Sequence, residues 1–223
     1  MREARQEGET ESVAAIRNFD HRKHLPSVSF IVVAAIVIAV FAAVLIYTGV
    51  YNIGADAPHT RAVYSLLDTV RDRSIAVHAR GIKPPANLAS AERVSRGAGL
   101  YDEMCTGCHL GPGMAPTELS QGLYPEAPEL AEHAHHSNAQ KFWMIKHGVK
   151  LTAMPAWGKT HSDELIWDMV AFVDRLPSMT PAQYKAIVAN APADHDEMMK
   201  EDEGANTKPA GEAHGGDGHD HQH

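Results

Sequence analysis

Two cysteines and a histidine stand together in one short segment of this chain. Cys105, Cys108 and His109 occur in the order Cys-Thr-Gly-Cys-His, and no other cysteine is present among the 223 residues. This C-x-x-C-H spacing is typical of covalent haem attachment, because each thiol can add to one vinyl group of a haem while the adjacent imidazole binds the iron. The segment therefore predicts one covalently attached haem c and a protein that moves electrons.

Three other kinds of C-x-x-C chemistry fit the sequence poorly. A structural zinc site needs four ligands, and the sequence has no second cysteine pair. A thioredoxin-like redox motif expects a βαβ pattern around it, whereas the flanks here are helical and loop-like. A disulfide between residues so close in sequence would close a loop too small to stabilise the fold much. No catalytic triad, P-loop or dinucleotide fingerprint occurs, so we predict no catalytic residues and an electron carrier rather than an enzyme.

The iron needs a second axial ligand from elsewhere in the chain. Met144 and Met169 fall inside apparent helices, where methionine usually fills the core, and Met114 lies too near the C-x-x-C-H segment to reach the opposite face of a haem. Met154 precedes Pro155, which disfavours helical backbone and presents the thioether from a loop. We therefore predict Met154. The other candidates are Met179, His133, His135, His136, His147 and His161.

A long apolar segment lies near the N-terminus. Residues 28–50 read VSFIVVAAIVIAVFAAVLIYTGV, and as a helix they would span roughly 34 Å, enough for a bilayer core. A buried core helix seldom needs so long an unbroken run. A signal peptide usually has an apolar region of only about 7–15 residues, and no clear A-x-A cleavage site follows. We expect residues 28–51 to be an uncleaved transmembrane anchor.

The charges beside this segment predict its orientation. Arg17, Arg22 and Lys23 precede it, whereas no lysine or arginine follows it until Arg61. The positive-inside rule then places residues 1–27 in the cytoplasm and the rest of the chain outside. This agrees with the haem prediction, since covalent haem attachment in bacteria takes place on the outer face of the plasma membrane. We predict a single-pass protein of the bacterial inner membrane with a periplasmic haem domain.

Three further segments follow the anchor, and the predicted fold is all-α. Residues 52–89 should form a juxtamembrane helix and linker; the helix, between Pro58 and Arg80, either covers part of the core or docks on a partner subunit. Residues 90–181 should form the haem domain, beginning with a helix that Ser90 caps and ending after a helix that Ser162 caps. Five apolar residues fall near one face of the juxtamembrane helix: Val63, Leu66, Leu67, Val70 and Val77.

Residues 182–223 form an acidic, histidine-rich tail. It is too poor in apolar residues to offset the entropy of ordering, so we expect disorder. Its histidines either form a loose site for a divalent metal such as copper, nickel or zinc or are merely solvated. The same two interpretations apply to the cluster at residues 133–136. The net charge of −8 argues against nucleic-acid binding. The tail histidines are His195, His214, His219, His221 and His223.

Residues 90–176 resemble the class I monohaem c-type cytochromes, a family that also supplies haem-c modules to oxidase and dehydrogenase subunits. The resemblance rests on Gly97 and Tyr101 before the C-x-x-C-H segment, on Phe172 in the last predicted helix, and on two loops. These loops are Pro128-Glu129-Leu130 and the stretch from Gly148 through Thr152, Met154, Pro155 and Trp157 to Gly158. The resemblance implies that Gly97 lets two helices approach closely and that Tyr101 packs against Phe172.

The resemblance also implies how the haem is held. A carbonyl at Pro128 would accept a hydrogen bond from His109 and fix its ring; Pro112 is the alternative. Trp157 would belong to the loop that carries Met154. Two protein ligands close the iron to oxygen and peroxide, and a thioether raises its potential. The expected partners are redox proteins at the outer face of the plasma membrane. The alternatives are a haem-c subunit of a larger membrane oxidase or dehydrogenase complex, and a sensor or enzyme with an open distal site.

Overall fold

The computed structural model describes residues 27–132 and 136–192 together with residues 198 and 200. The chain divides into two compact units, Met1–Ile53 and Gly54–His223. Within the described residues every regular element is a helix, as the sequence predicts. Residues 1–26, the histidines at 133 and 135, and all five tail histidines lie outside the described residues.

The first unit contains helix α2, Val28–Thr48. Ser27 begins it by accepting a hydrogen bond from the Phe30 amide, and Gly49 ends it in the left-handed region at φ 60°. None of its residues is buried in the protein. Among the described residues, this is the one helix long and apolar enough to cross a membrane.

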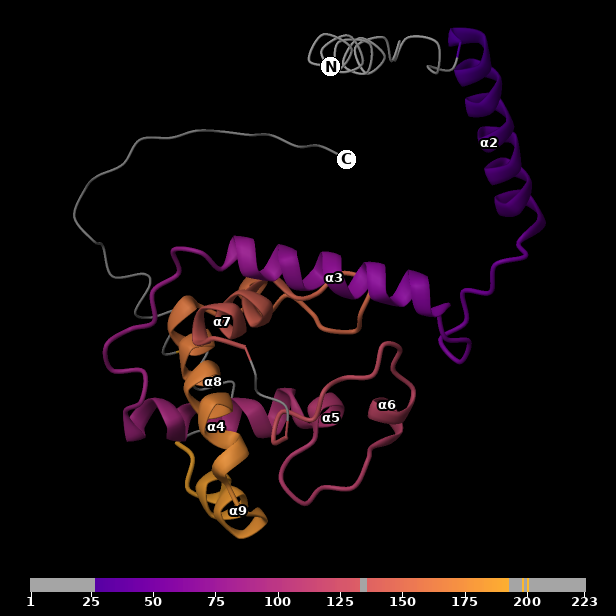
Figure 1. Ribbon diagram of the computed structural model, residues 1–223. Coiled ribbons are helices and arrows are strands. Elements are labelled where there is room, and N and C mark those ends of the chain that lie inside the picture. The colour runs from indigo at the N-terminus through magenta and orange to yellow at the C-terminus, as the bar shows by residue number, and fades with distance from the viewer. Residues whose placement is uncertain (1–26, 133–135, 193–197, 199, 201–223) are drawn as a thin grey trace, which may run out of the picture. The chain divides into compact units, whose positions relative to one another are not determined.

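The second unit is built on two crossing helices, α4 and α8 (Figure 1). Ser90 and Ser162 cap them by accepting hydrogen bonds from the amides of Arg93 and Leu165, which confirms both predicted starts. The helices of this unit are α3 (Arg61–His78), α4 (Ala91–Met104), α5 (Thr106–His109), α6 (Glu118–Gln121), α7 (Asn138–His147), α8 (Asp163–Arg175) and α9 (Pro181–Ala189), with 3₁₀ turns η2 (Trp157–Lys159) and η3 (Leu176–Ser178).

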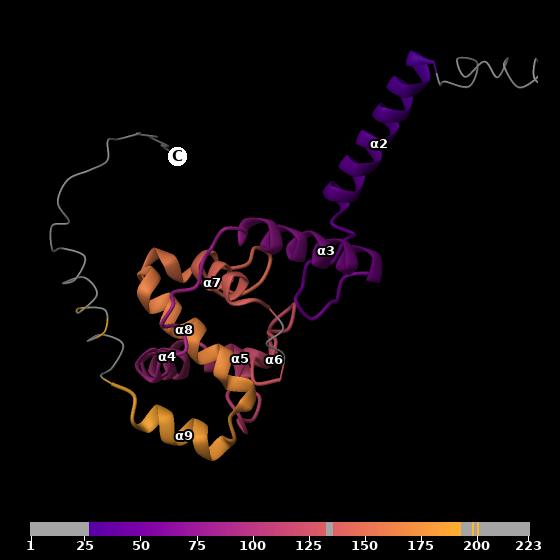
Figure 2. The same ribbon diagram turned by 60° about the vertical axis from the view of Figure 1, so that its left-hand side comes forward.

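The core lies where α4 and α8 meet, and α7 and α9 extend it (Figure 2). A Cβ on Gly97 would lie 2.0 Å from the carbonyl oxygen of Asp168, so only glycine permits this helix crossing. Tyr101 and Phe172 pack with ring centroids 5.3 Å apart. These are the two contacts that the family resemblance implies. Met169 is buried in the same core, as expected for a methionine inside a helix.

Helix α3 packs on α7 and contributes Ile75 to the buried interior. The predicted apolar face of this helix is only partly correct. Leu66, Val70 and Val77 are exposed, because the contact with the rest of the unit is centred about half a turn away, on Ile75 and Ala79. Helix α3 therefore covers the unit with one face and presents apolar side chains on another.

Helix α9 corrects the predicted boundary between the haem domain and the tail. Residues 182–189, assigned to a disordered tail, are helical, and Tyr184 is buried in the core. Thr180 and Gln183 form a capping box, and Pro181 occupies the first helical position, which favours a helix start there. The Tyr184 hydroxyl donates to an Asp102 carboxylate oxygen at 2.7 Å, which ties α9 to α4.

Candidate haem site

The C-x-x-C-H segment forms one short helix, α5, directly after α4. The amides of Cys108 and His109 both donate to the carbonyl oxygen of Cys105, at 3.2 and 2.8 Å. Both cysteines are half-buried free thiols. Tyr101 holds the end of this turn, since its hydroxyl donates to the Leu110 carbonyl at 2.6 Å. The local fold thus brings two unpaired thiols and one imidazole together on a single rigid turn.

The pKa of the Cys105 thiol distinguishes this turn from a redox dithiol. Burial, and secondarily the neighbouring Cys108, raises the pKa of Cys105 to about 12. A dithiol that exchanges disulfides needs the opposite shift, because the thiolate is the reactive form. Cys105 is therefore a protonated thiol at neutral pH and is unsuited to thioredoxin-like chemistry.

The imidazole of His109 is fixed by the main chain. Its Nδ1 lies 2.8 Å from the carbonyl oxygen of Pro128, the expected partner, and not of Pro112. An Nδ1–H that donates to this carbonyl leaves the Nε2 lone pair for a metal. Burial lowers the pKa of His109, although the Pro128 bond opposes that shift. The ring is therefore neutral at physiological pH, which is the form that binds iron.

The loop that carries Met154 is folded back on itself. The Val149 amide donates to the Met154 carbonyl at 3.2 Å, and the Met154 amide donates to the Thr152 hydroxyl at 3.1 Å. Gly148 begins the loop at φ 66°, and a Cβ there would lie 2.7 Å from the Met154 carbonyl oxygen. The half-buried thioether is thus held by a defined loop rather than along a helix.

Three of the other ligand candidates are placed less suitably. Met169 is buried between helices, and Met114 is exposed. His161 is buried, hydrogen-bonds the Thr160 hydroxyl at 2.9 Å and packs edge-on against Trp157. The described residues contain no group of three or more metal-ligating His, Cys, Asp or Glu side chains. The cluster at residues 133–136 lies largely outside the described residues.

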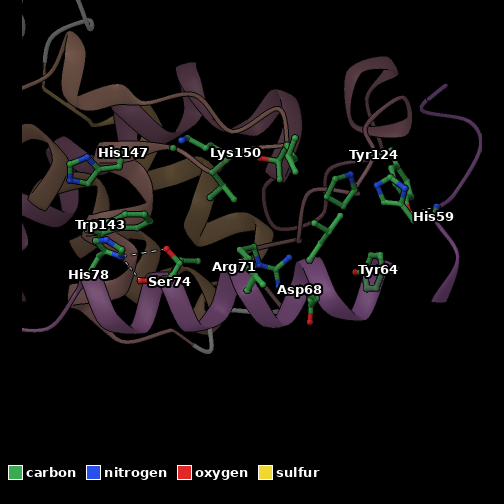
Figure 3. Close-up of a pocket in the computed structure, with 18 residues that line it drawn as sticks. His59, Tyr64, Asp68, Arg71, Ser74, His78, Tyr124, Trp143, His147 and Lys150 are labelled. Carbon is green, nitrogen blue, oxygen red and sulfur yellow. Dashed lines mark hydrogen bonds and ion pairs between the residues drawn. The ribbon is translucent and has the colours of Figure 1, made fainter. Parts of the chain in front are cut away.

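A cavity of about 570 Å³ opens beside the Met154 loop (Figure 3). Helix α3 forms one wall, α7 and residues 148–152 form another, and Tyr124 and Pro125 close a third side. Figure 3 shows a row of polar and aromatic side chains along α3 and opposite it: His59, Tyr64, Asp68, Arg71, Ser74, His78, Tyr124, Trp143, His147 and Lys150. Sequence reasoning missed the contribution of α3, because it lies outside the resemblance.

These residues fit a covalently attached haem. The turn offers two free thiols for the vinyl groups and one neutral imidazole whose Nε2 is available. A thioether stands on a separate loop, and an apolar-walled cavity lies alongside. Sulfur and imidazole nitrogen are the ligands that haem iron takes in electron carriers.

Part of the chain matches a known protein family. Residues 92–173 match the family described as cytochrome C oxidase, cbb3-type, subunit III. These residues form a c-type cytochrome domain. The domain implies a covalently attached haem c and confirms the resemblance seen in the sequence. The match covers somewhat more than a third of the chain and includes neither α2, α3 nor α9. No curated relative matches the chain.

Proposed function

We propose that this protein is a membrane-anchored, single-haem electron carrier that passes electrons one at a time between redox partners at the outer face of a bacterial plasma membrane. Electron transfer through haem c follows from the cytochrome domain itself. The observation that supports a permanently ligated haem is the His109–Pro128 hydrogen bond beside two free thiols, since it orients one imidazole nitrogen for the iron.

The proposed haem attachments are Cys105 and Cys108, with His109 and Met154 as axial ligands. Such a haem supplies one-electron redox chemistry and has no open position for oxygen or peroxide. The role of the protein is to keep both axial positions of the iron occupied by its own side chains. Thr152 and Val149 hold the Met154 loop through its main chain, so the thioether needs no rearrangement when the iron changes charge.

Helix α2 is the proposed anchor, with residues 1–27 in the cytoplasm and the cytochrome domain in the periplasm. The basic residues before α2 and the lack of lysine and arginine after it until Arg61 support this orientation. An anchored carrier diffuses in two dimensions, which raises its effective concentration for partners in the same membrane. Such partners belong to a respiratory chain.

Carbon monoxide tests whether the haem iron has an open axial position. The purified full-length protein is reduced at neutral pH and exposed to the gas, and its optical spectrum is followed. A His/Met-ligated haem leaves the spectrum unchanged. Rapid formation of a carbon monoxide adduct would contradict Met154 ligation and would favour a sensor or enzyme with an open distal site.

A second candidate is a haem-c subunit of a larger membrane oxidase or dehydrogenase. The family description of residues 92–173 as an oxidase subunit favours it, and so does the exposed apolar stripe Leu66, Val70 and Val77 on α3. Purification in mild detergent decides between the two. A stoichiometric partner that is retained by the unmodified protein and lost from Leu66→Asp supports the subunit, with Arg73→Asp as the control on the same helix. Recovery of the chain alone supports the free carrier.

A further inference from the structure

The cavity beside α3 lies between the loop that carries Met154 and the loop that leads to Pro128. Residues 148–152 line it and lead directly to Met154, while Tyr124 and Pro125 line it and lead to Pro128, which binds His109. Helix α3 is the remaining wall (Figure 3). Among the described lining residues, none comes from the cysteine-bearing helix α5. The cavity therefore adjoins the two loops that lead to Met154 and Pro128, without being lined by the cysteines or by the residues proposed to bind the iron.

The positions of the vinyl and propionate groups on haem determine which edge would lie away from α5. Haem carries its two vinyl groups on one edge and its two propionates on the opposite edge. Bonds from Cys105 and Cys108 would fix the vinyl edge at α5. The opposite edge, with two carboxylates, would then lie away from α5.

The charges around the cavity suit two carboxylates. The fixed charges among the lining residues are Arg71, Lys150 and Asp68, two positive and one negative, in a chain whose net charge is −8. Arg71 donates through Nε and Nη2 to Asp68 and Asp72, which orients its guanidinium. Among the described residues, Nη1 has no hydrogen-bond partner, so two N–H groups remain for an acceptor.

We propose that α3 is a built-in cover for the propionate edge of the haem, and that Arg71 and Lys150 are its counter-ions. This inference rests on the proposed function and extends it to residues outside the matched family segment. Positive charge beside a haem favours the ferrous over the ferric state, because the ferric iron carries one more positive charge. Arg71 and Lys150 therefore raise the midpoint potential, and helix α3 shields the haem from water.

The test compares two arginines on the same helix. Arg71→Gln and Arg73→Gln each remove one positive charge, but Arg71 lines the cavity and Arg73 is exposed outside it. Both full-length variants are purified in detergent, and their potentials are measured at one pH and ionic strength. Arg71→Gln should lower the midpoint potential. The equilibrium constant for reduction of the ferric haem should fall roughly fivefold. Arg73→Gln should change it less.

Two further readouts separate a specific contact from a general effect. The propionate bending band in the resonance Raman spectrum should shift in Arg71→Gln and stay in place in Arg73→Gln. The optical spectrum should remain that of a His/Met-ligated haem in both, so that a changed potential cannot come from ligand loss. Arg71→Lys, which keeps the charge, should recover most of the potential.

The outcomes distinguish this inference from the proposed function. Equal potential shifts in the two arginine variants, with unaltered Raman bands, overturn the role of α3 while leaving the electron carrier intact. An unmodified protein that lacks covalent haem overturns both. If Arg71→Gln yields no holoprotein, Lys150→Gln decides instead, with the exposed Lys159→Gln as its control. A shift for Lys150→Gln no larger than that of its control rejects the proposal.

Discussion

Gly97 of α4 and Asp168 of α8 lie so close that a Cβ on the glycine would be 2.0 Å from the aspartate carbonyl oxygen. The same Cβ would be 2.9 Å from the Cβ of Phe172. Both neighbours belong to the rigid interior of α8, so neither can move aside cheaply. This one contact sets the distance between the two helices on which the haem turn is built.

Gly97→Ala should therefore lower the free energy of unfolding by about 3 kcal/mol. Gly99→Ala, two residues along the same helix, is the matched control. There a Cβ would lie 3.3 Å from the Cβ of Ala191, at the edge of the core, and the helix propensity of alanine offsets part of that contact. Denaturant unfolding of both holoproteins measures the difference. Equal losses in the two variants would show that the α4–α8 distance is not set at Gly97.

The side chain of Asp168 also joins the two helices. It accepts hydrogen bonds from Arg93 at 2.6 Å and forms an ion pair with Arg96 at 3.0 Å, and it is almost fully buried. Asp168→Asn should cost about 2–3 kcal/mol of stability, below the full value for a buried pair because both arginines reach solvent. The control is Asp163→Asn, which breaks an exposed pair with Lys146 and should cost less than about 1 kcal/mol.

Replacing Met154 by alanine tests the second axial ligand. The oxidised protein should lose the weak sulfur-to-iron absorption band near the red end of the spectrum, and the midpoint potential should fall, because a thioether stabilises the ferrous state. Met144→Leu in α7 is the control and should keep both properties. If the band and the potential survive in Met154→Ala, another residue ligates the iron.

The membrane predictions depend on α2 and the residues before it. Deleting residues 28–48 should move the protein from the membrane fraction to the soluble fraction. In spheroplasts, added protease should cleave the cytochrome domain of the unmodified protein while an N-terminal tag stays protected. Changing Arg17, Arg22 and Lys23 to glutamate should reduce the correctly oriented fraction. A protected cytochrome domain in the unmodified protein would contradict the proposed topology.

Much of the fold follows from local signals in the sequence. Ser90 and Ser162 stand before amphipathic segments and cap them as expected, and the apolar run of α2 needs no tertiary information. The C-x-x-C-H turn and the loop before Pro155 are local motifs too. Each of these features depends on residues within a few positions of one another.

Features that depend on distant contacts were predicted less well. The apolar periodicity of α3 indicated a helix but not which face packs, because Ile75 is selected by α7 and its neighbours, which are distant in sequence. Helix α9 was assigned to the tail because its buried side chain, Tyr184, meets Asp102 across 82 positions. The cavity wall formed by α3 could not be found without the fold.

Electron transfer by this protein depends on a haem bound through two thioether bonds at Cys105 and Cys108. The most direct measurement is the optical spectrum of the purified full-length protein, produced with export and haem maturation intact, before and after extraction with acidified acetone. The protein should show a reduced c-type spectrum and keep its colour after extraction, and Cys105→Ala with Cys108→Ala should release or lack the haem. A colourless unmodified protein, or a haem that acetone removes, would contradict the account.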